Sequence, residues 1–95
     1  MVLGQIVLGE IERLRSLRIE DLRALPAISE KQIDLNGKPV ELYVYRESSQ
    51  NGRVTIIVKV FQRRFLYLSA AAEGFAITAD GQFVDLDDDE RWTLY

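Results

Sequence analysis

Apolar residues recur every three or four positions along the first 25 residues, with one gap, and this spacing is typical of one face of an α-helix. The residues on this stripe are Leu3, Val7, Ile11, Leu14, Leu22 and Leu25. Arg18 stands where the spacing calls for an apolar residue. Either its charged end reaches water beside a continuous helix, or the helix breaks near Ser16–Ile19 and begins again with Glu20-Asp21 in its first turn. Pro26 ends the helical segment.

After Pro26, apolar and polar residues alternate, which is the period of a β-strand. The candidate strands are about 29–35, 39–47, 53–67, 71–79 and 82–86. Asn36-Gly37 and Asp80-Gly81 are dipeptides that two-residue hairpin turns prefer, and Asn51-Gly52 lies in a longer polar loop. Such short links make successive strands antiparallel neighbours, so the pattern predicts a simple meander.

We therefore predict an α+β fold, in which an N-terminal helix packs on a four- to five-stranded antiparallel β-meander and residues 1–95 form a single domain. This layout resembles the cystatin-like and helix-grip folds, in which a long helix lies across an antiparallel sheet. The resemblance covers most of the chain but includes no shared motif, so it implies nothing specific about activity.

The second and third predicted strands carry apolar side chains on both faces of the sheet. One face is aliphatic and suits the helix stripe as a core; its residues are Val40, Leu42, Val44, Val54, Ile56, Val58 and Val60. The fourth strand separates large residues from small ones, and the alternation leaves open which set meets the helix. The large residues are Phe75 and Ile77, and the small ones are Ala72, Gly74 and Ala76.

The second face is too apolar to stay open to water, because one helix cannot cover both sides of a sheet. We expect an interaction surface that consists of Tyr43, Tyr45, Ile57, Phe61 and Phe75. Exposed apolar patches larger than a few hundred Å² usually mark interaction sites, and tyrosine suits them because it buries area while keeping a polar group. The alternatives are that the C-terminal residues Arg91–Tyr95 fold back over this face or that it binds a small ligand.

The chain has no cysteine and no histidine, which removes several kinds of chemistry. Disulfides, thiolate metal sites and the usual general base are excluded, so we expect no cofactor, no metal ion and no catalytic residue. The net charge of −3 argues against DNA and anionic membranes as partners. The apolar start, Met1–Leu8, is too short to cross a bilayer, and we expect a cytoplasmic protein.

Two stretches resemble binding motifs without completing them. Asp85, Asp87 and Asp89 have the spacing of the first three ligands of a calcium loop. Glu90 occupies the position that needs glycine, so a solvated acidic turn is expected instead. Residues 59–67 interleave basic and aromatic side chains, as strands that bind single-stranded RNA do. The glycine-containing signature of such domains is absent and the net charge is negative, so we do not expect RNA binding.

A tyrosine and a carboxylate held in an apolar cup can polarise a carbonyl group and transfer a proton. The candidates for such a pair are Tyr43, Tyr45, Tyr67, Asp34, Glu41 and Glu73, and no spacing places two of them in one pocket. We therefore predict a non-enzymatic protein-interaction or self-association module, which forms a homodimer or binds another protein. The alternative is a small-molecule-binding or weakly catalytic domain with its site between helix and sheet, which a closed cavity lined by tyrosine hydroxyls would favour.

Overall fold

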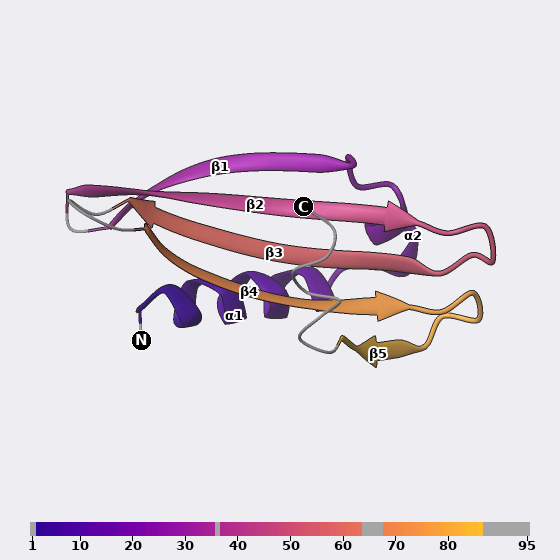
Figure 1. Ribbon diagram of the computed structural model, residues 1–95. Coiled ribbons are helices and arrows are strands. Elements are labelled where there is room, and N and C mark those ends of the chain that lie inside the picture. Colours follow the sequence, from indigo (N-terminus) through magenta and orange to yellow (C-terminus); the bar gives the residue numbers. More distant parts are fainter. Residues whose placement is uncertain (1, 36, 64–67, 87–95) are drawn as a thin grey trace.

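The computed structural model describes residues 2–35, 37–63 and 68–86 of this chain. Within these ranges two helices, α1 (Val2–Arg15) and α2 (Ile19–Arg23), precede five strands. The strands are β1 (Ile28–Leu35), β2 (Lys38–Ser48), β3 (Val54–Arg63), β4 (Leu68–Ile77) and β5 (Phe83–Asp85). They form one sheet in the order β1-β2-β3-β4-β5, and every neighbouring pair is antiparallel (Figure 1). The predicted meander is confirmed.

The helical segment breaks where Arg18 interrupts the apolar stripe. α1 ends at Arg15, α2 begins at Ile19, and Arg18 has an extended backbone with φ −69° and ψ 152°. Its exposed guanidinium lies 3.4 Å from the carboxylate of Asp21, an acidic residue in the first turn of α2. Negative charge at this end of a helix complements the helix dipole. Of the two alternatives for Arg18, the break and restart is therefore correct.

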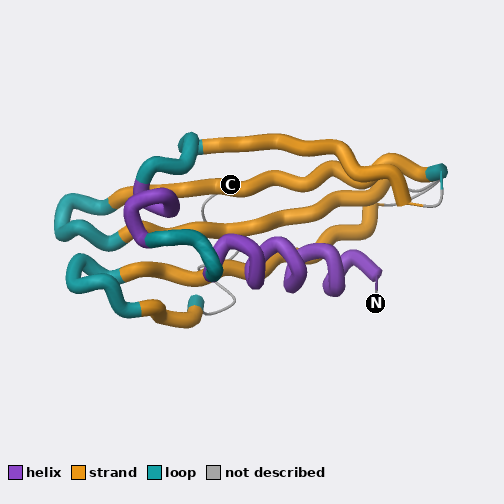
Figure 2. The backbone as a smooth tube through the Cα atoms, turned by 180° about the vertical axis from the view of Figure 1, so that it is seen from behind, coloured by secondary structure: helices purple, strands orange, loops and turns teal. Residues whose placement is uncertain are grey.

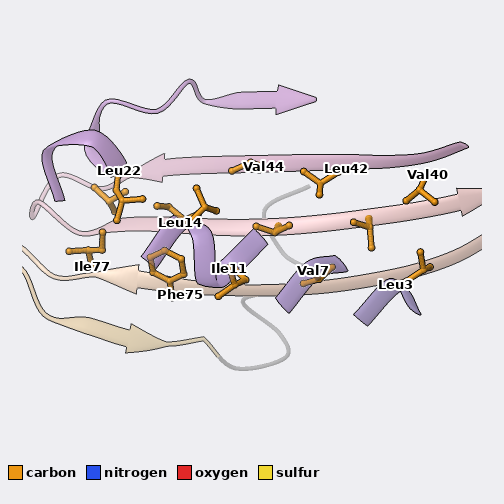
Figure 3. Packing of buried hydrophobic residues seen from close by; sticks show 14 residues of the cluster. Leu3, Val7, Ile11, Leu14, Leu22, Val40, Leu42, Val44, Phe75 and Ile77 are labelled. Atoms are coloured by element: carbon orange, nitrogen blue, oxygen red, sulfur yellow. The ribbon is translucent and has the colours of Figure 1, made fainter. Parts of the chain in front are cut away.

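α1 packs on β3 and β4 on one face of the sheet and runs roughly along these strands (Figure 2). The predicted helix stripe and the predicted aliphatic face pack against each other in a single core (Figure 3). The buried residues of this core are Leu3, Val7, Ile11, Leu14, Leu22, Val40, Leu42, Val44, Val54, Ile56, Val58, Val60, Phe75 and Ile77. Burial of each such side chain contributes about 1.5–3 kcal/mol relative to exposure, so this core dominates the stability of the fold.

The structure answers the open question about β4. The register pairs Phe75 with Ile56 and Ile77 with Val54, so both large side chains of β4 face the helices. The Arg15 guanidinium at the end of α1 lies 5.1 Å from the centroid of the Phe75 ring. The small residues of β4 consequently occupy the opposite face.

Glycines with positive φ lie in the three predicted turns, but Asp80-Gly81 is not the predicted two-residue turn. The Thr78 amide donates to the Gln82 carbonyl oxygen and the Gly81 amide to the Thr78 carbonyl oxygen, so the loop has three residues, 79–81. Gly37, Gly52 and Gly81 have φ values of 79°, 87° and 91°. Glycine adopts this conformation with little strain because it lacks a Cβ atom. Asn36, the first residue of the predicted Asn36-Gly37 turn, lies outside the described residues.

Arg23 of α2 ties the helix layer to two loops at one end of the sheet. Its terminal nitrogens donate hydrogen bonds to the carbonyl oxygens of Gly52 and Thr78, at 2.8 and 2.9 Å. Arg46 on β2 donates from Nε to the carbonyl oxygen of Leu25 just after α2. These partly buried bonds join segments that are far apart in the sequence.

We expect Arg23→Ala to lower the free energy of unfolding by about 2 kcal/mol, because it removes two hydrogen bonds from a charged donor. Arg18→Ala is the matched control, since Arg18 is exposed and its ion pairs with Glu20 and Asp21 lie at the surface. Such pairs are worth about 0.5 kcal/mol or less. Urea unfolding followed by circular dichroism measures both losses. Equal losses in the two variants would argue against the bracing role of Arg23.

Candidate functional site

We call the side of the sheet that carries Tyr43, Tyr45, Ile57 and Phe61 the tyrosine face; it is turned away from the helices. The register places Tyr45 opposite Ile57. The rings of Tyr43 and Tyr45 stack with centroids 6.0 Å apart, and the Phe61 ring meets Tyr43 edge-on at 5.8 Å. Four of the five residues in the predicted interaction surface are therefore brought together.

Phe75, the fifth predicted residue, lies on the other face of the sheet. Its side chain is fully buried in the core beneath the helices, so its assignment to the tyrosine face is wrong. The register puts Phe75 opposite Ile56, and residues directly opposite each other in an antiparallel pair share a face. Alternation along β4 identifies which residues share a face but not which face meets the helices.

The centre of the tyrosine face is closed. Ile57 is 0% exposed and Tyr45 is 9% exposed, while the other two residues of the face are half-buried. Leu86, which follows β5, belongs to the same buried cluster as Ile57 and Tyr45. Arg91–Tyr95, the predicted alternative cover, lie outside the described residues. The open area of this face therefore lies away from its centre.

Lys59 lies at the centre of the tyrosine face and is only 2% exposed. It stands opposite Tyr43 on β2 and Ala72 on β4, and its Nζ lies 5.5 Å from the centroid of the Tyr45 ring, within the range of a cation–π contact. Burial lowers the pKa of Lys59 because it disfavours the charged amine. This burial removes Lys59 from any phosphate-binding surface, and residues 64–67 of the same basic and aromatic stretch lie outside the described residues.

The lowered pKa of Lys59 predicts a pH dependence of stability. Between the lowered pKa and about 10.5 the unfolded chain binds more protons than the folded protein, so raising the pH through this range stabilises the fold. We expect Lys59→Met to lack this gain. As the pH rises, the free energy of unfolding of the natural protein should increase relative to that of Lys59→Met. The increase is about 1.4 kcal/mol for each tenfold difference in proton affinity of Lys59 between the folded and unfolded states.

Urea unfolding of the natural protein and Lys59→Met at several pH values from neutral to alkaline measures this difference. Lys38→Met, at an exposed position on β2, is the control and should show no such trend. A difference between Lys59→Met and the natural protein that stays constant with pH would refute the effect.

One open part of the tyrosine face lies over β1, at one edge of the sheet (Figure 1), and another is the 40% exposed Val84 on β5 at the opposite edge. β1 pairs with β2 along all eight of its residues and is exposed along almost its whole length. In the described ranges no strand pairs with its outer side. At the opposite edge, β5 has only three residues. β1 is therefore the long open edge, and sequence reasoning did not single it out.

The hydrogen-bond pattern indicates which main-chain groups of β1 point outward. The Arg46 amide donates to the Ala27 carbonyl oxygen at 2.9 Å, just before the first residue pair of β1 and β2. In an antiparallel ladder, residues then alternate between bonding to the neighbouring strand and pointing away from it. The residues whose N–H and C=O groups point away from β2 are Ile28, Glu30, Gln32 and Asp34.

Charged residues of β1 and β2 are segregated between the two faces of the sheet. By register, the carboxylates on the tyrosine face are Glu30, Asp34, Glu41 and Glu47, and the basic residues on the helix side are Lys31, Lys38 and Arg46. The Tyr43 hydroxyl donates a hydrogen bond to Glu41 at 3.3 Å. Burial raises the pKa of Tyr43, and the carboxylates of Glu30 and Glu41 raise it further, so negative charge gathers around this hydroxyl.

The acidic residues of the described ranges do not gather into a metal site. No three histidine, cysteine, aspartate or glutamate residues among them are placed to hold a metal ion. Asp85, the first residue of the calcium-like spacing, pairs with Arg15 at 3.1 Å, and the remaining acidic residues 87–90 lie outside the described residues. Of the candidate tyrosine–carboxylate pairs, Tyr43 and Glu41 meet on the sheet surface.

Shallow depressions of the described surface lie at the ends of strands. One of about 320 Å³ is lined by Asn51, Arg53, Thr78, Ala79 and Asp80. Another of about 270 Å³ is lined by Gln32, Ile33, Asp34 and Pro39, next to the open edge of β1. Neither lies between the helices and the sheet, where the small-molecule alternative places its site.

These features define the class of protein: a helix layer on one face of an open, five-stranded antiparallel sheet, with an α+β layout. No protein-family model, no curated protein and no solved structure matches the chain. The likeness to cystatin-like and helix-grip folds therefore remains one of layout. In the part of the chain that the structure describes, no helix has the length and apolar character needed to cross a membrane.

Proposed function

We propose that the protein is a non-enzymatic interaction module that binds another protein along the outer edge of β1. The observation that carries this proposal is an eight-residue edge strand that is exposed along almost its whole length, with alternate N–H and C=O groups directed outward. Such an edge is a template for a strand of another chain, because each added hydrogen bond satisfies a main-chain group.

The tyrosine face contributes contacts beside this edge. Tyr43 lies opposite Glu30 and is half-buried, so it borders the open strip over β1. Ile28, which is 50% exposed, provides an apolar contact at the start of the strand. The proposed contact surface is thus shifted from the closed centre of the tyrosine face toward the sheet edge.

A second copy of the chain is the alternative partner, and the protein would then be a homodimer formed through β1. The cytoplasm is the proposed location, because a cysteine-free chain has no disulfides that need an oxidising compartment. The small-molecule-binding alternative calls for a cavity between helices and sheet, whereas the two depressions described above lie at strand ends.

An unbiased library of displayed peptides tests the proposal. Peptides selected on the natural protein should bind Gln32→Ala, which keeps the outward amide, and should bind Gln32→Pro about tenfold more weakly or not at all. Proline at this position removes an N–H that points away from β2, so the pairing of β1 with β2 is retained. Circular dichroism checks that both variants are folded. Light scattering on the same three proteins tests the homodimer form.

Hydrogen exchange provides a second readout of the same complex. Binding of a selected peptide should protect the outward amides of Ile28, Glu30, Gln32 and Asp34. Unchanged affinity for Gln32→Pro, or protection confined to other strands, would overturn the proposal.

A further inference from the structure

The charges beside the open edge of β1 indicate which side chains a partner strand would carry. A strand added to this edge would lie about 4.8 Å from β1, with its side chains directly opposite those of β1. On the tyrosine face it would meet the carboxylates of Glu30 and Asp34, with Glu41 one strand further in. The basic residues of β1 and β2 lie on the other side of the sheet, and Lys59, which is on the same side, lies two strands in from this edge on β3.

The depression at the end of β1 fits a long basic side chain. Its volume is about 270 Å³, and its lining combines the apolar surfaces of Ile33 and Pro39 with the polar groups of Gln32 and Asp34. The stem of a lysine or arginine can pack on the apolar part while its charged end reaches the Asp34 carboxylate.

A second copy of β1 is a poor occupant of the same edge. Two copies related by an axis normal to the sheet pair antiparallel, and each face continues into the same face of the other copy. The register centred on Lys31 places it opposite Lys31 of the partner subunit. The register centred on Gln32 places Glu30 opposite Asp34 of the partner subunit. Like charges directly opposite each other destabilise a strand pair, and these registers have the longest overlap.

We infer that the edge of β1 binds an extended segment of a different protein, and that this segment carries lysine or arginine at alternate positions. These basic side chains lie next to the carboxylates of Glu30, Asp34 and Glu41. This inference rests on the proposed function and specifies its partner. The intervening side chains of the segment face the helix side of β1, where Lys31 lies near the Glu10 carboxylate of α1, so this side sets no strong charge preference.

Three synthetic peptides of about ten residues test this inference by fluorescence anisotropy at low ionic strength with the full chain. The basic probe alternates lysine with threonine, and the matched probes carry glutamine or glutamate in place of lysine. The basic probe should bind about tenfold tighter than the glutamine probe, and the glutamate probe should bind most weakly. Physiological salt should weaken the binding of the basic probe.

Charge variants locate the effect. Glu30→Gln combined with Asp34→Asn should weaken binding of the basic probe about tenfold. Glu12→Gln combined with Glu20→Gln changes the net charge equally at exposed helix positions and should leave binding unchanged. Equal losses of affinity for the basic probe in the two double variants would overturn the inference, because they would indicate that the net charge of the protein alone attracts the probe.

The remaining outcomes separate this inference from the proposed function. If the glutamine probe binds as tightly as the basic probe and still depends on the Gln32 amide, the basic partner is refuted and the interaction module is retained. If the basic probe binds Gln32→Pro as tightly as the natural protein, strand addition fails and both proposals fall. Absence of binding by the basic probe refutes the inference directly.

Discussion

Replacing Phe75 with alanine is expected to lower the free energy of unfolding by about 3–5 kcal/mol. The Phe75 ring is fully buried in the core on the helix side of β4, 5.6 Å from the Phe83 ring and next to the Arg15 guanidinium. Its removal leaves a cavity between α1 and the sheet, so both transfer free energy and packing contacts are lost. Urea unfolding monitored by circular dichroism measures the loss.

Phe61→Ala is the control, because Phe61 is a half-buried aromatic residue on the tyrosine face. It should lose clearly less stability than Phe75→Ala, about 1–2 kcal/mol. Since a loss of 5 kcal/mol can unfold a small domain, Phe75→Leu provides a milder variant with an expected loss of about 1 kcal/mol. Phe75→Leu should leave peptide binding at β1 unchanged. A Phe75→Ala loss no larger than that of Phe61→Ala would show that the register of β4 is wrong.

Gly74→Ala is expected to lower the free energy of unfolding by about 2–3 kcal/mol, because there is no room for a side chain at this position. A Cβ atom at Gly74 would lie 2.6 Å from the carbonyl oxygen of Ile56, 2.8 Å from Cδ1 of Leu86 and 3.1 Å from Cγ1 of Ile57. The first contact is with main chain in the neighbouring strand, so β4 itself has to shift. Gly74 therefore allows Leu86 to seat on the tyrosine face.

Gly9→Ala is the matched control for this substitution. A Cβ atom at Gly9 in α1 meets nothing within 4 Å, so the same change should raise stability by about 0.5–1 kcal/mol. Combining Gly74→Ala with Leu86→Ala should lower the free energy of unfolding by less than the sum of the two single effects, because the clash between the new Cβ atom and Leu86 is removed. A neutral or stabilising Gly74→Ala would contradict the close packing of Leu86 on β4.

The sequence predicts the elements of this fold well because two periodicities dominate it. The helix stripe, the aliphatic strand face and the turn glycines are local patterns, and each leads directly to an observed element. The face on which Phe75 lies depends on the register between β3 and β4, which alternation within one strand does not contain. The burial of Lys59 has no local signal either, since a lysine in an alternating strand ordinarily points to water.

The open edge was within reach of the sequence. In a simple meander the first strand lies at the edge of the sheet, and the segment Ile28–Leu35 shows weak alternation and carries three charged residues, Glu30, Lys31 and Asp34. The apolar pattern instead indicates an interaction surface on the central strands, where Ile57 and Tyr45 are in fact buried. The outward direction of the β1 amides follows only from the observed hydrogen bonds.

The strand order also has a consequence for how the chain folds. Every strand pairs with its neighbour in the sequence, so each hairpin closes a short loop at a small entropic cost. The longest closure is the packing of α1 on β3 and β4, which are separated from it by α2, β1 and β2. We therefore expect the hairpins to form before α1 packs on β3 and β4, because contacts between residues close in the sequence lose less loop-closure entropy.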